Sequence, residues 1–240
     1  KPEQQLSFIE NRQVSVTAEK VAINAVMAGC KPEYMPVIVA TVDALADPLY
    51  GFHGPATSTG GAAVFMLVNG PIAKQLDINN GDNLFGPGWR ANATIGRAIR
   101  LIMRNVIGTL PGELDRSSLG HAGKYSYCIA ENEEDSPWPG FHTTRGFKPT
   151  QNAVTIFAAF APHQYSNGLS ATPEGVLTTA CAQMRVSAGT NRQPQYAMVF
   201  AGEHQEIMKK AGWSREDVQQ YVYENTQMKM ADLQRANIRP

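Results

Sequence analysis

The stretch AVFMLVNGP, residues 63–71, sets six consecutive apolar residues directly before an Asn-Gly-Pro turn. A short apolar run that ends in a turn is typical of a buried β-strand, because both faces of such a strand contact the core. The Gly-Pro pair predicts a short helix after it. Apolar runs and turn residues predict further strands at residues 125–130, 154–160 and 196–200. Helical spacing and capping residues predict helices at residues 17–29, 32–45, 91–106, 174–186, 202–211 and 215–225.

Alternation of strands and helices predicts an α/β fold, a layered sandwich with a mixed sheet of about four or five strands flanked by helices. The polar first residues, 1–13, are expected to form an arm or a linker. Residues 14–225 are expected to form a single α/β domain, and residues 226–240 a polar tail.

The composition bears on partners and on location. Lys and Arg together number 21, as do Asp and Glu, so the net charge of zero predicts no binding of nucleic acid. The apolar runs are far shorter than a bilayer span, and no secretory leader is recognisable, which predicts no association with a membrane. Three widely spaced cysteines predict reduced thiols in the cytoplasm. Charged residues make up only 18%, which favours a homo- or hetero-oligomer.

Cys30 lies between two predicted helices, just before the N-terminus of the second. Unpaired backbone N–H groups and the positive end of the helix dipole stabilise a thiolate at such a place. Cys30 is therefore a candidate catalytic nucleophile or metal ligand. The alternative is a small cysteine that fills the corner between the helices.

The polar loop before the first strand contains His53, and the strand itself ends at Asn69. A loop with a histidine, hydroxyl groups and consecutive glycines makes His53 a candidate general acid or base, although a histidine in such a loop is commonly only solvated. Asn69 is a candidate substrate-binding residue, because α/β proteins place ligand contacts at the carboxyl ends of strands.

A Gly-Pro-Gly turn opens the helix at residues 91–106, with Arg90 and Asn92 in its first turn. This arrangement predicts that Arg90 and Asn92 bind an anionic or polar group of a substrate, while helix capping by Asn92 is the alternative. The turn has neither of the glycine patterns that bind nucleotides, so no nucleotide cofactor is expected. Arg97, Arg100 and Arg104 on the same helix are expected to face solvent or a partner.

The strand at residues 125–130 contains Cys128 and leads into an acidic run that begins with Glu131 and Glu133. Neighbouring carboxylates can share a proton or a cation, which makes Glu131 a candidate catalytic residue. The alternative is a solvated loop. His204, at another junction of strand and helix, is a candidate for substrate binding. There is no close metal-ligand spacing, so folding would have to gather Cys30 and Cys128 with His53 and Glu131 into a site for a transition-metal ion, or into a thiol site.

Five stretches carry a resemblance to a known family: AVMAGCKPEYMPV, LVNGPIAKQLDINNG, GWRANATIGRAIRLI, GKYSYCIAENEEDSPW and AGWSREDVQQYVYE. Together they resemble a family of bacterial proteins of unassigned activity, encoded beside or fused to proteins with the selenocysteine/cysteine-Gly-Ser-Cys (UGSC) motif. The resemblance extends from about residue 18 to residue 224. Because this chain has no Cys-Gly-Ser-Cys, the resemblance implies that a separate subunit or an upstream segment supplies a reactive thiol.

Together these features predict an enzyme, or a subunit of one, that acts on a small polar or anionic molecule. Its expected chemistry is thiolate- or metal-assisted, of the lyase/hydratase or redox type, in a pocket shared by the junctions of helices and strands. The alternative is a non-catalytic subunit that binds a partner within a hetero-oligomeric complex.

Overall fold

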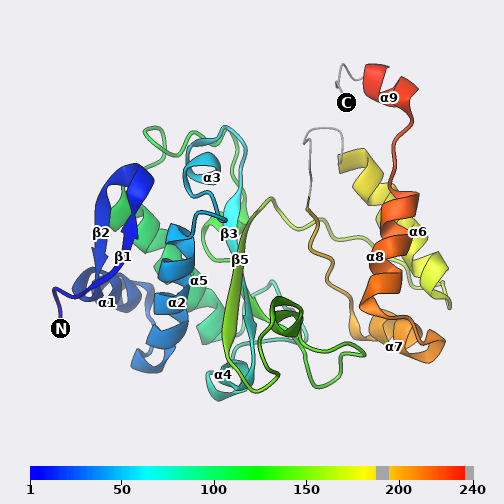
Figure 1. Ribbon diagram of the computed structural model, residues 1–240, viewed down its shortest axis with the longest axis horizontal. Helices are drawn as coiled ribbons and strands as arrows, with labels where there is room; N and C mark the ends of the chain where they lie inside the picture. The colour runs from blue at the N-terminus through cyan, green and yellow to red at the C-terminus, as the bar shows by residue number, and fades with distance from the viewer. Residues whose placement is uncertain (188–194, 236–240) are drawn as a thin grey trace. The chain divides into compact units, whose positions relative to one another are not determined.

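The computed structural model describes residues 1–187 and 195–235. The chain forms two compact units (Figure 1), where a single domain over residues 14–225 was expected. The first unit comprises Lys1–Glu133 and Pro139–Pro162, and the second comprises Glu134–Trp138 and His163–Pro240. The chain therefore passes between the units twice within the loop that follows residue 131, and once more after Pro162.

The central sheet of the first unit has three strands in the order β4-β3-β5. They are β3 (Ala63–Asn69), β4 (Cys128–Ala130) and β5 (Ala153–Ala159). β3 runs parallel to β4 and antiparallel to β5, so the sheet is mixed, and the predicted α/β class is confirmed. All residues of β3 except Leu67 are buried, as its apolar run predicts. The sheet has fewer strands than the four or five expected, since two further strands pair separately.

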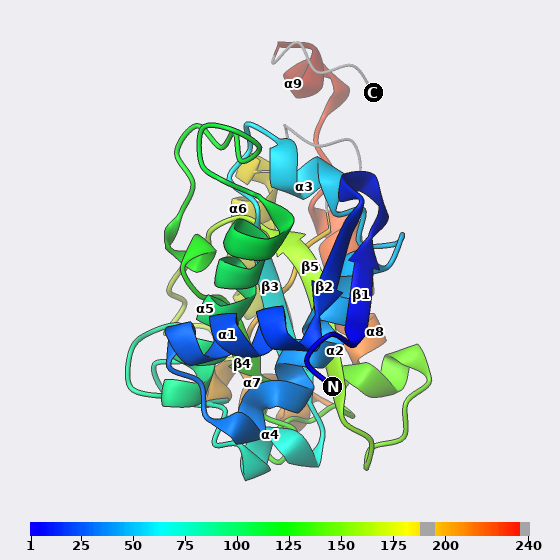
Figure 2. The ribbon, with the colours of Figure 1, turned by 90° about the vertical axis from the view of Figure 1, so that its left-hand side faces the viewer.

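Those two strands, β1 (Gln5–Ile9) and β2 (Val14–Thr17), form an antiparallel sheet of their own (Figure 2). The turn between them contains a short 3₁₀-helix, η1 (Glu10–Arg12). Residues 1–13 are thus folded, which corrects the expectation of an arm or linker. The reason is that alternate side chains of the polar segment enter the core: Ile9 is 2% exposed, and Val16 on the partner strand is fully buried.

Longer helices cover the sheet of the first unit. α1 (Ala18–Ala28) is capped by the Thr17 side chain and ends at Gly29, as predicted. A 3₁₀ turn, η2 (Pro32–Tyr34), leads into α2 (Met35–Ala46). α5 (Arg90–Ile102) continues into a π-helical turn, η3 (Met103–Ile107), and packs along α1. α2 and α5 lie on one side of β3 and β5 (Figure 1).

Short helical turns occur in segments for which no regular structure was predicted. They are α3 (His53–Thr57), η4 (Ala122–Lys124) and η5 (Phe141–Arg145). α4 (Pro71–Gln75) was predicted from its Gly-Pro start. α3 precedes β3 and α4 follows it, so these two helices lie at opposite ends of the strand (Figure 1).

The second unit is helical. It contains α6 (Pro173–Ser187), α7 (Gly202–Ala211), α8 (Arg215–Asn225) and α9 (Met230–Arg235), and Ser214 with Asp217 forms the predicted capping box of α8. Residues 196–200 are not a strand: Met198 and Phe200 pack against the helices' apolar core, and no strand of the described residues pairs with them. α9 lies in the tail, whose residues 236–240 are outside the described part. Within residues 1–187 and 195–235, no helix has the length and apolar character needed to cross a membrane.

Candidate functional site

The carboxyl ends of the parallel strands β3 and β4 bring three polar side chains together. Asn69 ends β3 and is fully buried, and its Nδ2 donates to Glu131 Oε2 at 2.5 Å and to Glu133 Oε1 at 3.0 Å. Both glutamates follow β4 directly and are half-buried. The structure therefore joins Asn69 and Glu131, two of the predicted site residues, at one edge of the sheet and adds Glu133 to them.

Backbone N–H groups fix the two carboxylates. Gly70 N–H donates to Glu133 Oε1 at 2.7 Å, and Phe141 N–H donates to Glu131 Oε2 at 2.6 Å. Gly70 has a φ of +87°, and a Cβ placed on it would clash with the Gln151 carbonyl group, whose carbon would lie 2.9 Å away. Only glycine fits this turn, and the turn aims the Gly70 N–H at Glu133.

His142, in η5, is the residue of this site that sequence reasoning missed. It is only 1% exposed, and neither ring nitrogen has a hydrogen-bond partner among the described residues. A Cβ placed on Gly140 would lie 2.6 Å from Glu133 Oε2 and 2.8 Å from His142 Cε1, so the carboxylate and the imidazole both flank Gly140. His142 lies in a long irregular loop, and the only sequence signal near it was the Pro-Trp-Pro-Gly turn just before it.

Asn69, Glu131, Glu133 and His142 are named here the carboxyl-edge cluster. Native proteins pair most of their buried polar groups, so unpaired buried groups call for a functional explanation. Within the described residues this cluster contains three such atoms, Asn69 Oδ1 and both ring nitrogens of His142. Two carboxylates and an imidazole side by side can accept, hold and return a proton.

The structure does not support the expectation that Cys30 is an activated thiolate. Cys30 is half-buried and donates its thiol to the Thr94 carbonyl oxygen at 3.2 Å. Burial raises the pKa of the Cys30 thiol, and this outweighs the opposite effects of the hydrogen bond to Thr94 and of the nearby Arg90. Burial also raises the pKa of Cys128 to about 12, with a further contribution from neighbouring Cys30. Both sulfurs are therefore protonated near neutral pH, which disfavours them as nucleophiles.

We expect slow reaction of these thiols in the folded protein. At pH 7.5 a disulfide reagent such as dithionitrobenzoate should modify Cys30 slowly and leave Cys128 and Cys181 unmodified, because the thiolate is the reactive species and both are buried. All three should react within the mixing time in guanidinium chloride. If one thiol of the folded protein instead reacts rapidly, and this rapid phase is absent from the Cys30→Ser variant, then Cys30 is an activated nucleophile after all.

Arg90 and Asn92 bind the protein's own backbone. Arg90 Nε donates to the Gly29 carbonyl oxygen at 3.0 Å, which links the end of α1 to the start of α5. Asn92 is buried, and its Oδ1 accepts from Asn79 N–H at 2.7 Å. Its Nδ2 donates to the carbonyl oxygens of Asn79 and Cys128. The amide of Asn92 is thus used to hold β4, which corrects its assignment to substrate binding.

Neither of the two predicted histidines belongs to the carboxyl-edge cluster: His53 lies elsewhere in the first unit, and His204 belongs to the second unit. His53 is exposed and begins α3, at the opposite end of β3 from Asn69 (Figure 1). His204 belongs to the second unit, where its Nε2 lies 2.8 Å from the Asn167 carbonyl oxygen. His53 therefore does not join Asn69 and Glu131, as the expected shared pocket requires.

The donor set for the expected metal site is incomplete. In residues 1–187 and 195–235, no group of three or more His, Cys, Asp or Glu side chains is arranged to hold a metal ion. Cys30 and Cys128 are neighbours, but the exposed His53 begins α3 before β3, and a transition-metal site requires three or four ligands. The residues present therefore do not fit the metal centre that was expected.

No protein-family model, no curated protein and no solved structure matches this chain. Its chemistry has to be inferred from the geometry of its own residues.

Proposed function

We propose that this protein is an enzyme, or a subunit of one, that moves protons on a small polar or anionic molecule at the carboxyl-edge cluster. The observation that carries the proposal is His142, which is buried beside Glu133 with both ring nitrogens unpaired among the described residues. Leaving such a group unpaired costs about 1–3 kcal/mol, a cost that a catalytic role explains.

Three residues of the cluster have distinct roles in this proposal. Glu133, half-buried and fixed by Gly70 N–H, is the general base, and His142 is the proton donor. Asn69 sets the distance between Glu133 and Glu131 and holds a polar group of the substrate through its free Oδ1.

The proposed reaction is of the lyase/hydratase type. Glu133 takes a proton from the carbon next to the substrate's carbonyl or carboxyl group, and the electron pair of that C–H bond moves to the carbonyl oxygen. In a dehydration this pair then returns from the oxygen to form a double bond between the α and β carbons, and the bond from the β carbon to its hydroxyl group breaks with its electron pair on the hydroxyl oxygen. His142 donates the proton that lets this hydroxyl leave as water. The raised pKa of Cys30 and Cys128 makes this acid–base route a better fit than a route through either thiol. The resemblance to the UGSC-associated family adds the proposal that a thiol from another subunit or segment takes part.

The test is exchange of carbon-bound hydrogen with solvent. The protein is incubated in D2O with a set of small hydroxy and keto acids, and loss of the α-proton signal is followed by NMR. We expect exchange of at least one acid above the buffer rate, lowered about 10²–10⁴-fold by Glu133→Gln. The Gln side chain keeps an acceptor for Gly70 N–H but cannot take the proton.

His142→Leu separates a catalytic role from a structural one. Leucine has a similar volume and no polar atoms, so removing two unpaired nitrogens should leave stability equal or raise it by about 1 kcal/mol. Exchange should nevertheless fall about 10²-fold or more. The control, His53→Gln, should exchange at the wild-type rate. A wild-type protein that exchanges none of the acids, or a Glu133→Gln variant as fast as wild type, would refute the proposal.

A specific surface favours the alternative of a partner-binding subunit. Ile23, Val26 and Met27 lie at helical spacing on α1 and are 52%, 75% and 63% exposed. Apolar side chains gathered on one helix face are typical of an interface. We propose an oligomer that uses this face, in the cytoplasm, where the three free cysteines stay reduced. Polar replacement of these three residues should then lower the molar mass measured by light scattering.

A further inference from the structure

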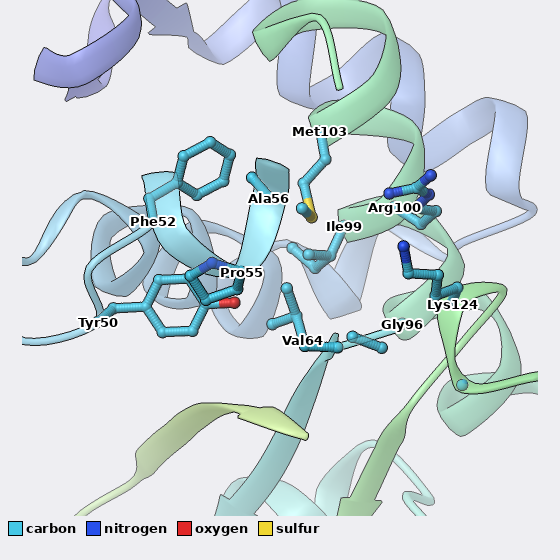
Figure 3. A pocket seen from close by; sticks show the side chains of 13 residues that line it. Tyr50, Phe52, Pro55, Ala56, Val64, Gly96, Ile99, Arg100, Met103 and Lys124 are labelled. Carbon is cyan, nitrogen blue, oxygen red and sulfur yellow. The ribbon is translucent and has the colours of Figure 1, made fainter. Parts of the chain in front are cut away.

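A small pocket lies at the amino end of β3, the end away from the carboxyl-edge cluster (Figure 3). The space that the centre of a water-sized group can occupy inside it is about 20 Å³, so the pocket admits only a small molecule. It is named here the cationic pocket, and its lining includes Tyr50, Phe52, Val64, Met103, Arg100 and Lys124.

The lining has two chemically different sides. Tyr50, Phe52 and Val64 form an apolar side, and Met103, the first residue of the π-helical turn η3, completes it. Arg100 and Lys124 lie across from Tyr50 and Phe52 with their charged ends toward the pocket (Figure 3). Turns of π-helix occur frequently at functional sites. The pocket thus suits a molecule with one apolar part and one anionic part.

The charges on the polar side do not balance. Arg100 Nη2 and Lys124 Nζ each lie 2.8 Å from the Asp115 carboxylate. The side chains of Arg100, Lys124 and Asp115 are only 16%, 14% and 7% exposed. Among the residues that the structure describes, these two cations share one carboxylate, so this largely buried group carries one uncompensated positive charge. A bound anion would compensate it, because charges taken out of water require partners.

The donors of the two cations are used unequally. Lys124 Nζ donates to both oxygens of Asp115 and to Ser117 Oγ. Arg100 uses Nη2 for Asp115, and the rest of its guanidinium has no hydrogen-bond partner among the described residues. A guanidinium with free N–H groups in one plane matches the two oxygens of a carboxylate.

We propose that the cationic pocket binds a short-chain aliphatic carboxylate. Its carboxylate bonds to the free N–H groups of Arg100, and its alkyl part contacts Phe52 and Met103. The small volume excludes nucleotides and sugar phosphates. Since the pocket and the carboxyl-edge cluster lie at opposite ends of β3, this site does not depend on the function proposed for the cluster.

The test uses propionate as the probe and the Met103 methyl group as the reporter. The protein is labelled with ¹³C in its methionine methyl groups, and Met103→Leu identifies the signal. At constant ionic strength, propionate up to about 50 mM should shift the Met103 signal in a saturable way, a range that covers millimolar affinity. Propionamide, which lacks the charge, and sulfate, which lacks the alkyl part, should not shift it.

Variants test whether the shift of the Met103 signal arises from binding in the cationic pocket. Arg100→Gln and Lys124→Met should each weaken propionate binding about tenfold or more. Ala56→Leu narrows the pocket without changing its charge and should also weaken propionate binding about tenfold or more. This variant tests the location of the binding site even if the charge variants do not fold. Arg97→Gln on the same helix and Glu133→Gln should bind as wild type. No saturable shift with propionate, or equal shifts with sulfate or propionamide, would overturn the proposal.

Discussion

Replacing Asp115 by alanine is expected to lower the free energy of unfolding by about 3–5 kcal/mol. The substitution leaves Arg100 and Lys124 largely buried without their shared carboxylate, and removing one partner from a buried ion pair has a cost of that size. Urea denaturation at pH 7 measures it. The control is Asp232→Ala, which breaks an exposed pair with Arg235 and should change stability by less than about 1 kcal/mol.

The contribution of Asp115 should also depend on pH. Burial alone would raise the pKa of Asp115, but hydrogen bonds from Lys124, Ser117 and Arg100 outweigh it and hold that pKa well below its usual range. A carboxylate with a depressed pKa in the folded state stabilises the protein above its unfolded pKa, near 4. The difference between wild type and Asp115→Ala should therefore shrink as the pH falls from about 5 to about 2. A difference that stays constant with pH would contradict this account.

Gly70→Ala is expected to lower the free energy of unfolding by a similar amount, about 3–5 kcal/mol. Alanine at a φ of +87° is strained, and its Cβ would clash with the Gln151 carbonyl oxygen, so the backbone at the end of β3 has to move. The movement also disturbs the bond from Gly70 N–H to Glu133. Thermal and urea denaturation measure the loss.

Gly146→Ala is the matched control for Gly70→Ala. Gly146 has a φ of +86°, but a Cβ there has no atom within 4 Å. Gly146→Ala should therefore lower the free energy of unfolding only by the conformational strain of alanine at this φ, about 1 kcal/mol. Equal losses for the two variants would show that the backbone conformation, rather than the close approach to Gln151, accounts for the effect at Gly70.

Local signals predicted much of the fold. Thr17 and Gly29 bound α1 because a side-chain cap and a left-handed glycine are encoded within a few residues. β3 and its Gly-Pro turn were predicted for the same reason. The segment at residues 196–200 has the apolar character of a strand, but a strand also needs a partner, and pairing is a property of the whole fold.

The site was predictable only in part. Asn69 and Glu131 could be placed together because the carboxyl ends of parallel strands meet at one edge. His142 could not, because an irregular loop has no periodicity that fixes where its side chains lie. Arg100 was expected to face solvent or a partner, whereas it pairs with Asp115, which lies in a loop beyond the helix. Contacts of this kind depend on tertiary packing.

The central claim is that Glu133 and His142 act together in proton transfer, and a double-variant comparison tests it most directly. α-Proton exchange in D2O is measured for wild type, Glu133→Gln, His142→Leu and the variant carrying both changes. If the two residues act as a unit, the double variant should be within about threefold of the slower single variant, because the second change removes nothing further. Losses that multiply would contradict the account and show that Glu133 and His142 act independently.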